Sequence, residues 1–207
     1  PGRRGDRGNR VSQQADGKLL LVGRAESASH ARMAIVRLTT GGQRDTSFDG
    51  DGRVDLDFGP DFTAAEGLHV RPLADGRILV VGNAGRTLPG AVASADFAAV
   101  RLLANGSLDP GFGAGGKATY DFAIGGDHYD LAYDVVVLDD GRAVVCGAAR
   151  ANAPNNFDMA CLRLLPDGQP DPDFGQVLVP FDRGGDLQDA AVRMVRDGLG
   201  RLLLTGP

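Results

Sequence analysis

The sequence predicts an all-β fold: a β-propeller, or an open segment of one, with about 3.5 four-stranded antiparallel blades. Three observations carry this prediction. An apolar run that closes with a glycine recurs roughly every 60 residues. Each of the first three copies is followed by a second apolar run that contains one arginine. Turn residues separate the runs at fixed places, as expected for short strands joined by hairpins.

The first recurring run contains a tight turn followed by an apolar strand. Its copies are residues 16–23, 75–82, 140–147 and 199–206. The Asp-Gly turn predicts a hairpin between a half-apolar strand, here called strand a, and the apolar strand, called strand b. Residues 68–73 and 135–138 are examples of strand a, and residues 78–81 are an example of strand b. Because strand b is apolar at every position, we expect it to be buried on both faces.

The second recurring run predicts strands c and d. Strand c contains the arginine, and a turn with an Asp-x-x-Phe motif leads into strand d. In the first repeat strand d alternates, with Val54, Leu56 and Phe58 on one side and Arg53, Asp55 and Asp57 on the other. Alternation with period two indicates a half-exposed strand. The third strand d contains Pro180, which is tolerated at the edge of a sheet.

The arginines of strand c require acceptors, because an unpaired buried charge is very costly. An aspartate follows each arginine eight residues later, just past the c–d turn. The pairs are Arg37 with Asp45, Arg101 with Asp109, and Arg163 with Asp171. We expect each carboxylate to bind its guanidinium and tie the turn to the strand. This interpretation is structural, since a functional site repeated in every blade would be unusual.

The order of these motifs resembles the delta-60 repeat family. The pattern D-G-[KR]-[IL]-L-V-x-G is followed by A-x-x-R-L, by an x-G turn and by L-D-x-x-F-G-x-x-G-K, and the second repeat matches it best at residues 75–82, 97–102 and 105–117. The resemblance covers about residues 11–207. It departs at Leu199, which replaces the turn aspartate, and at Gln176 and Val177. It implies a β-propeller domain of unknown function from a bacterial, surface or secreted protein, with no shared activity.

The repeats divide the chain into five segments. We expect a flexible N-terminal segment at 1–10, blade repeats at 11–63, 64–126 and 127–185, and strands a and b of a partial fourth blade at 186–207. Such an arc cannot close a ring of four or more blades. We therefore expect the chain to be part of a longer one that supplies further blades, with association of two chains as the weaker alternative. An immunoglobulin-like sandwich is the main alternative fold, but it does not explain the repeats.

Composition narrows the possible partners. The formal net charge is −5, which argues against binding to nucleic acid. No apolar run approaches the roughly 20 residues of a membrane-spanning helix, so no membrane span is expected. The basic, glycine-rich residues 1–10 do not resemble a signal peptide. An extracytoplasmic or secreted location is therefore expected only from the family resemblance.

No catalytic or cofactor-binding set is recognisable, so the chain is expected not to be an enzyme. The one weak metal candidate is a calcium loop with Asp49, Asp51 and Asp55, whose alternating carboxylates could supply several oxygen ligands. It lacks the full twelve-residue calcium motif, and a solvated turn is the preferred interpretation. The histidines His30, His69 and His128 have no partner at metal-binding spacing.

Two cysteines fall in the third repeat. Cys146 lies on strand b and Cys161 on strand c, and neighbouring strands could bring them close enough to bond. A disulfide and a pair of small buried hydrophobic residues both remain open, and the second is preferred.

The b–c and d–a connections share one face of a propeller, and this face is where the sequence varies most. The longest b–c connection is an insertion at 83–96 in the second repeat, and acidic residues gather in the d–a connections at Asp61, Glu66, Asp127, Asp130, Asp186 and Asp189. The acidic rim could favour cations or cationic partners, although ordinary solvated loops are the preferred interpretation of these residues. Loops on a rigid scaffold commonly carry binding sites. We therefore expect a non-enzymatic binding scaffold that takes a protein or carbohydrate through these loops. The alternative is an extracytoplasmic enzyme or carbohydrate-binding propeller with its site at the central channel.

Overall fold

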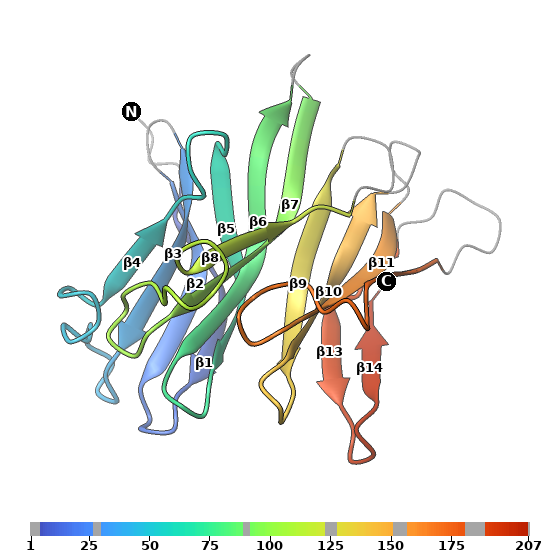
Figure 1. Ribbon diagram of the computed structural model, residues 1–207. Helices are drawn as coiled ribbons and strands as arrows, with labels where there is room; N and C mark the ends of the chain where they lie inside the picture. The colour runs from blue at the N-terminus through green and yellow to red at the C-terminus, as the bar shows by residue number, and fades with distance from the viewer. Residues whose placement is uncertain are drawn as a thin grey trace.

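The computed structural model describes residues 5–26, 30–88, 92–122, 128–150, 157–180 and 189–206. The described part of the chain is all-β and contains fourteen strands (Figure 1). Within these ranges, no helix is long and apolar enough to cross a membrane.

Each of the first three repeats forms four antiparallel strands in the order a, b, c, d. The first holds β1 (Arg7–Gln13), β2 (Leu19–Glu26), β3 (Ala31–Leu38) and β4 (Arg53–Leu56). The second holds β5 (Ala64–Pro72), β6 (Ile78–Leu88), β7 (Val92–Leu102) and β8 (Lys117–Tyr120). The third holds β9 (Asp130–Val137), β10 (Ala143–Arg150), β11 (Phe157–Leu164) and β12 (Gln176–Val179). A two-stranded ribbon of β13 (Arg193–Arg196) and β14 (Leu202–Thr205) follows.

The boundaries differ from the sequence expectations in three places. β1 starts at Arg7, inside the segment expected to be flexible, because it pairs with β2 from Arg7 onward. The connection at 83–96 is mostly a hairpin rather than a loop, since β6 and β7 stay paired out to Leu88 and Val92. This ladder satisfies backbone groups that a loop would leave to water. Pro180 follows the end of β12 instead of lying within the strand.

The repeats stack face to face, and the apolar cores lie between them. One core joins the first and second repeats and includes Ile35 and Val80. A second joins the second and third repeats and includes Val81 and Leu162. A third joins the third repeat to the β13–β14 ribbon. Neighbouring residues of β6 thus enter different cores, which confirms that this strand b is buried on both faces.

Candidate functional site

The recurring Arg–Asp pairs form the junctions between repeats. In each repeat the Nε of the strand c arginine donates to the aspartate Oδ2, at 2.8 Å for Arg37–Asp45, 2.6 Å for Arg101–Asp109 and 2.7 Å for Arg163–Asp171. The phenylalanine three residues after each aspartate lies beneath the guanidinium at 4.6, 4.8 and 5.0 Å from its ring centroid. A cation on the a–b turn also reaches each aspartate: Lys18, Arg77 and Arg142.

The first junction extends from this cluster into the next repeat. Arg37 Nη1 donates to the carbonyl oxygen of Ala104, in the c–d turn of the second repeat. The Asp49 N–H donates to the Asn105 carbonyl at 2.7 Å. A Cβ added to Gly106 would lie 3.0 Å from the Phe48 ring, so the ring packs directly on this glycine. The turn of one repeat therefore seats on the Arg–Phe pair of the repeat before it.

The second junction repeats this arrangement. Arg101 Nη1 donates to the Pro166 carbonyl, and the Gly113 N–H donates to the Asp167 carbonyl at 2.8 Å. A Cβ added to Gly168 would lie 2.8 Å from the Phe112 ring. The recurrence of the same contacts gives these motif residues a structural role.

The carboxylates of the junctions are held in their charged form. The Ser47 hydroxyl, together with Lys18 and Arg37, holds the pKa of Asp45 well below its ordinary range, although burial opposes this. Burial alone would raise the pKa of Asp109, but the Gly111 N–H and the Arg101 guanidinium bring it below its ordinary value. Both carboxylates are therefore charged at neutral pH.

The structure does not gather the three calcium candidates. Asp51 Oδ1 accepts the Arg53 N–H at 2.9 Å, and Asp55 Oδ1 accepts from the Arg53 side chain at 2.7 Å. The Asp49 amide is used at the first junction. Among the described residues, no group of three or more His, Cys, Asp or Glu side chains could hold a metal ion.

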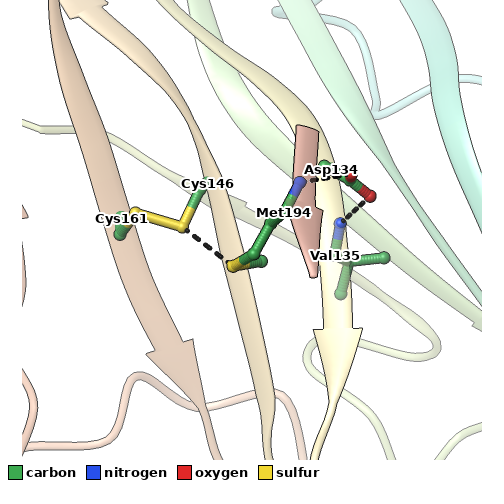
Figure 2. The surroundings of a disulfide bond; sticks show 5 residues. All are labelled: Asp134, Val135, Cys146, Cys161 and Met194. Atoms are coloured by element: carbon green, nitrogen blue, oxygen red, sulfur yellow. Dashed lines mark hydrogen bonds between the residues drawn. A yellow bond between two sulfur atoms is a disulfide. The ribbon is translucent and has the colours of Figure 1, made fainter. Parts of the chain in front are cut away.

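Two of the histidines contact carboxylates. His69 is buried with its Nδ1 against Asp134 Oδ1. Asp134 also accepts the N–H groups of Val135 and Met194, each at 2.8 Å (Figure 2). Together with the His69 contact, these bonds join the second repeat, the third repeat and β13. His128 Nδ1 lies 3.1 Å from Asp121 Oδ1 near the surface, and this contact raises the pKa of the His128 imidazole.

The two cysteines form a disulfide, and the preferred expectation of two free hydrophobic residues is wrong. Cys146 of β10 and Cys161 of β11 pair directly across the sheet, with Cα atoms 4.2 Å apart. That separation places the two side chains within bonding reach on the same face. Met194 Sδ lies 3.5 Å from Cys146 Sγ, so the disulfide is part of the core under β13 (Figure 2).

A cavity of about 430 Å³ opens where the b–c and d–a connections meet. Its walls come from the end of β2, the start of β5, the end of β6, the start of β7 and β9 with the residue before it. Tyr129 and Tyr133 of the third repeat face it, as do Asn83 and Arg86 of the second. Arg24 and Glu66 complete its polar lining. Three repeats thus contribute to one concave surface of the size that small ligands occupy.

The polar groups of the cavity are only partly engaged with the protein. Arg86 Nη2 lies 3.1 Å from Asp96 Oδ1, whereas Arg86 Nε is buried and has no hydrogen-bond partner among the described residues. Asn83 Oδ1 accepts the Ala132 N–H at 2.8 Å. Among the described residues, Asp96 is thus the one hydrogen-bond acceptor of the Arg86 guanidinium that lines the cavity.

The acidic side chains near the cavity differ in their burial and in their partners. Burial raises the pKa of Asp96, and burial raises the pKa of Asp130, next to Tyr129, to about 6. Glu66 is held by Asn9 at 2.8 Å and by Arg7 at 3.3 Å. Of the other acids expected at this rim, Asp61 is exposed and Asp189 is buried. Asp127 and Asp186 lie outside the described residues.

The stacked four-stranded units and their repeated junctions define a repeat protein built from propeller-type blades. A family model described as "Domain of unknown function (DUF5122) beta-propeller" matches residues 14–48, 73–112 and 138–174. The chain belongs to this β-propeller family. The matched segments run from the a–b turn to the Asp-x-x-Phe phenylalanine in each repeat, which is compatible with the delta-60 resemblance. Comparison with curated proteins gives no match.

Sequence reasoning named Glu66 and the insertion 83–96, which contribute to the cavity lining, but it did not name Tyr129 or Tyr133. The insertion in the second repeat was the available signal, because it carries Arg86 and Ser94 into the wall. Tyr129 and Tyr133 gave no signal, since they belong to no repeated motif. Their place in the cavity depends on how the third repeat stacks on the second.

Proposed function

We propose that this chain is a non-enzymatic binding module of an extracytoplasmic bacterial protein, and that its ligand is a carbohydrate held in the cavity between the second and third repeats. The observation that carries the proposal is that the Arg86 side chain lines the same cavity as the rings of Tyr129 and Tyr133. Ligand sites combine apolar and aromatic walls with a few placed polar groups.

The lining suits a sugar ring rather than a purely apolar ligand. Tyrosine offers an apolar ring face for the C–H side of a sugar and a hydroxyl for its polar edge. The Arg86 guanidinium and the amide nitrogen of Asn83 are donors, and the Glu66 carboxylate is an acceptor. Together these groups match the mixture of hydroxyl donors and acceptors on a carbohydrate.

The disulfide supports an extracytoplasmic location. Disulfides persist in oxidising compartments and are rare in reducing ones. The Cys146–Cys161 bond therefore agrees with the location that the family resemblance implies. Mass spectrometry of the alkylated native protein tests this, since two free thiols in cells would argue for a reducing compartment.

A glycan array probed with the 207-residue chain, followed by calorimetric titration of the best ligand, tests the proposed function. Tyr133→Ala and Arg86→Gln are each expected to weaken binding at least tenfold. Tyr133→Phe keeps the ring and is expected to weaken it less. Arg32→Gln is the matched control, because Arg32 is an exposed side chain on β3.

Two results would contradict this function. The first is the absence of binding to any glycan on the array. The second is equal affinity for the Arg86→Gln and Arg32→Gln variants, which would place the ligand elsewhere. Turnover of a bound glycan would instead support the alternative of a propeller enzyme with its site at a central channel.

A further inference from the structure

The glycine that closes each strand b lies directly against the backbone of strand a. A Cβ added to Gly82 would overlap the Glu66 carbonyl oxygen, so no larger residue fits there. The same overlap recurs at the other closing glycines. The contacts are Gly23 with the Arg7 carbonyl, Gly147 with the Leu131 carbonyl and Gly206 with the Ala190 carbonyl. The recurring glycine therefore allows a close approach of strand a that a side chain would prevent.

This close approach coincides with a β-bulge in strand a of the first three repeats. In β5, the residues on either side of Leu68 pair with two consecutive residues of β6, so Leu68 is an extra residue without a partner there. Asn9 is the extra residue of β1, and Tyr133 is the extra residue of β9. A bulge of this kind redirects the side chains around it.

The apolar cores show that the bulges change the direction of the side chains. In a regular strand, residues separated by an odd number of positions face opposite sides. Ala65 and Val70 are five positions apart in β5, yet both lie in the core between the first and second repeats. Ala132 and Val135 are three positions apart in β9 and share the core between the second and third repeats. The bulge residue between each pair belongs to none of the three cores of the described chain.

The bulge side chains gather at the cavity. Leu68 and Tyr133 both line it, although they come from different repeats. The Asn9 amide donates to Glu66 Oε1 at 2.8 Å, and Glu66 is part of the same lining. Each of the first three repeats therefore presents one bulge residue at this site or beside it.

The residue at the bulge differs between repeats, whereas the glycine opposite is the same in all of them. Asn9 is polar, Leu68 is apolar, and Tyr133 combines an aromatic ring with a hydroxyl. Because the backbone and the glycine form the bulge, the extra side chain can change without changing the fold. The bulge position is therefore suited to setting what the cavity binds.

Leu68 contributes an apolar wall to the cavity. Ala65 of β5 and Leu131 of β9 also line it. None of these side chains has a hydrogen-bonding group, so a sugar hydroxyl against them would lose its bonds to water without replacement. A methyl group gains from the same contact, because its transfer from water to an apolar surface is favourable. Leu68 thus favours a sugar that carries a methyl group.

We propose that the bulge residues of strand a are ligand-contacting positions of the cavity, and that Leu68 selects a sugar with a methyl group, as acetamido and 6-deoxy sugars have. This inference rests on the proposed carbohydrate function. The Tyr133 ring then takes the C–H face of the sugar, and the methyl group lies against Leu68. The polar edge of the sugar is left to Asn83 and Glu66, which line the same cavity.

NMR titration of the 207-residue chain with two matched pairs of sugars tests the inference. N-acetylglucosamine is compared with glucose for the acetamido group, and L-fucose is compared with L-galactose for the 6-deoxy group. We expect the methyl-bearing sugar of at least one pair to bind about tenfold more tightly, which is the lower end of the selectivity that one small apolar group gives in an apolar pocket.

Leu68→Asn is the decisive variant, because it installs the residue that the first repeat carries at the same bulge. It is expected to reduce the preference to about twofold or less. Leu68→Met keeps an apolar side chain and is expected to retain the preference. Tyr133→Leu installs the bulge residue of the second repeat and is expected to weaken both sugars of a pair equally. Val11→Asn is the control, because Val11 is an exposed apolar residue of β1 outside the cavity lining.

Each outcome bears on a different part of the inference. Equal affinities within both sugar pairs would overturn the selection of a methyl group. A preference that persists in Leu68→Asn, or that is lost equally in Leu68→Met, would overturn the role of Leu68. These results all require a sugar to bind, so they leave the proposed function in place. Absence of binding by all four sugars would also overturn the inference, and the glycan array then shows whether the proposed function fails with it.

Discussion

The second and third repeats carry the same Arg-to-Phe motif in different surroundings. Arg101 bonds to Asp109, to the Gly111 carbonyl and to the Pro166 carbonyl of the next repeat. Arg163 bonds only to Asp171 among the described residues. The difference teaches that the motif has two functions. One half stabilises the turn of its own repeat, and the other half recognises a neighbour.

The third repeat also has a covalent cross-link that the others lack. Cys146 and Cys161 occupy the positions of Val81 and Ala99 in the second repeat. In the second repeat this pair packs within the core shared with the third repeat. The disulfide therefore holds β10 and β11 together in the blade whose covering ribbon has only two short strands.

The largest expected effect is the loss of stability when Arg101 is replaced, compared with the loss when Arg163 is replaced. Arg101→Met leaves the Pro166 carbonyl and part of Asp109 without a partner, and it should lower the free energy of unfolding by about 3 kcal/mol. Arg163→Met should lower it less, because its Nη atoms have no acceptor to lose. Urea unfolding at pH 7 measures both, with Arg32→Met as a control expected near zero. Equal losses of unfolding free energy for the Arg101→Met and Arg163→Met variants would contradict a stabilising contact between Arg101 and the next repeat.

The disulfide gives the next largest effect. The cross-linked residues are 15 positions apart, so removing the bond should cost about 2–3 kcal/mol. The double variant Cys146→Val/Cys161→Ala installs the side chains of the second repeat and keeps most of the packing volume. Its loss should match that of the wild-type chain under reducing agent, and reducing agent should not affect the variant. An unchanged wild-type unfolding curve under reducing agent would show that the bond contributes nothing.

The smallest expected losses of stability come from replacing two turn glycines, of which only one packs against a neighbouring repeat. Gly42 and Gly168 have similar φ values of 78° and 84°, but only Gly168 lies against a phenylalanine ring. Gly42→Ala should cost about 1 kcal/mol for its left-handed backbone. Gly168→Ala should cost about 2 kcal/mol, because the Phe112 ring must also move. Thermal unfolding of both variants measures the difference, and equal losses would mean that the glycine–phenylalanine contact carries no energy.

Much of the fold followed from local patterns. The Asp-Gly turns and apolar runs located every strand b, and the alternation in residues 53–58 indicated an outer strand. The apolar setting of Arg101 pointed to Asp109 as its acceptor, and the structure places them 2.6 Å apart. The hairpin at 83–96 was mistaken for a loop because its polar residues pair through the backbone, which has no sequence pattern of its own.

The candidate site was much less accessible to sequence reasoning. Tyr133 and Arg86 are 47 positions apart and belong to different repeats, yet they line one cavity. His69 and Asp134 likewise meet only because one blade stacks on the next. Their proximity depends on the angle and register of stacking, and no local pattern encodes these.

The sequence by itself determined the repeat unit, its four strands and the charge pairs within each repeat, because these depend on residues that are close along the chain. Only the tertiary structure decided which junction arginines find a second acceptor, that His69 meets Asp134, and where a cavity opens. The physical reason is that these features arise from the docking of one sheet on another. Identical motifs then have different environments according to what lies against them.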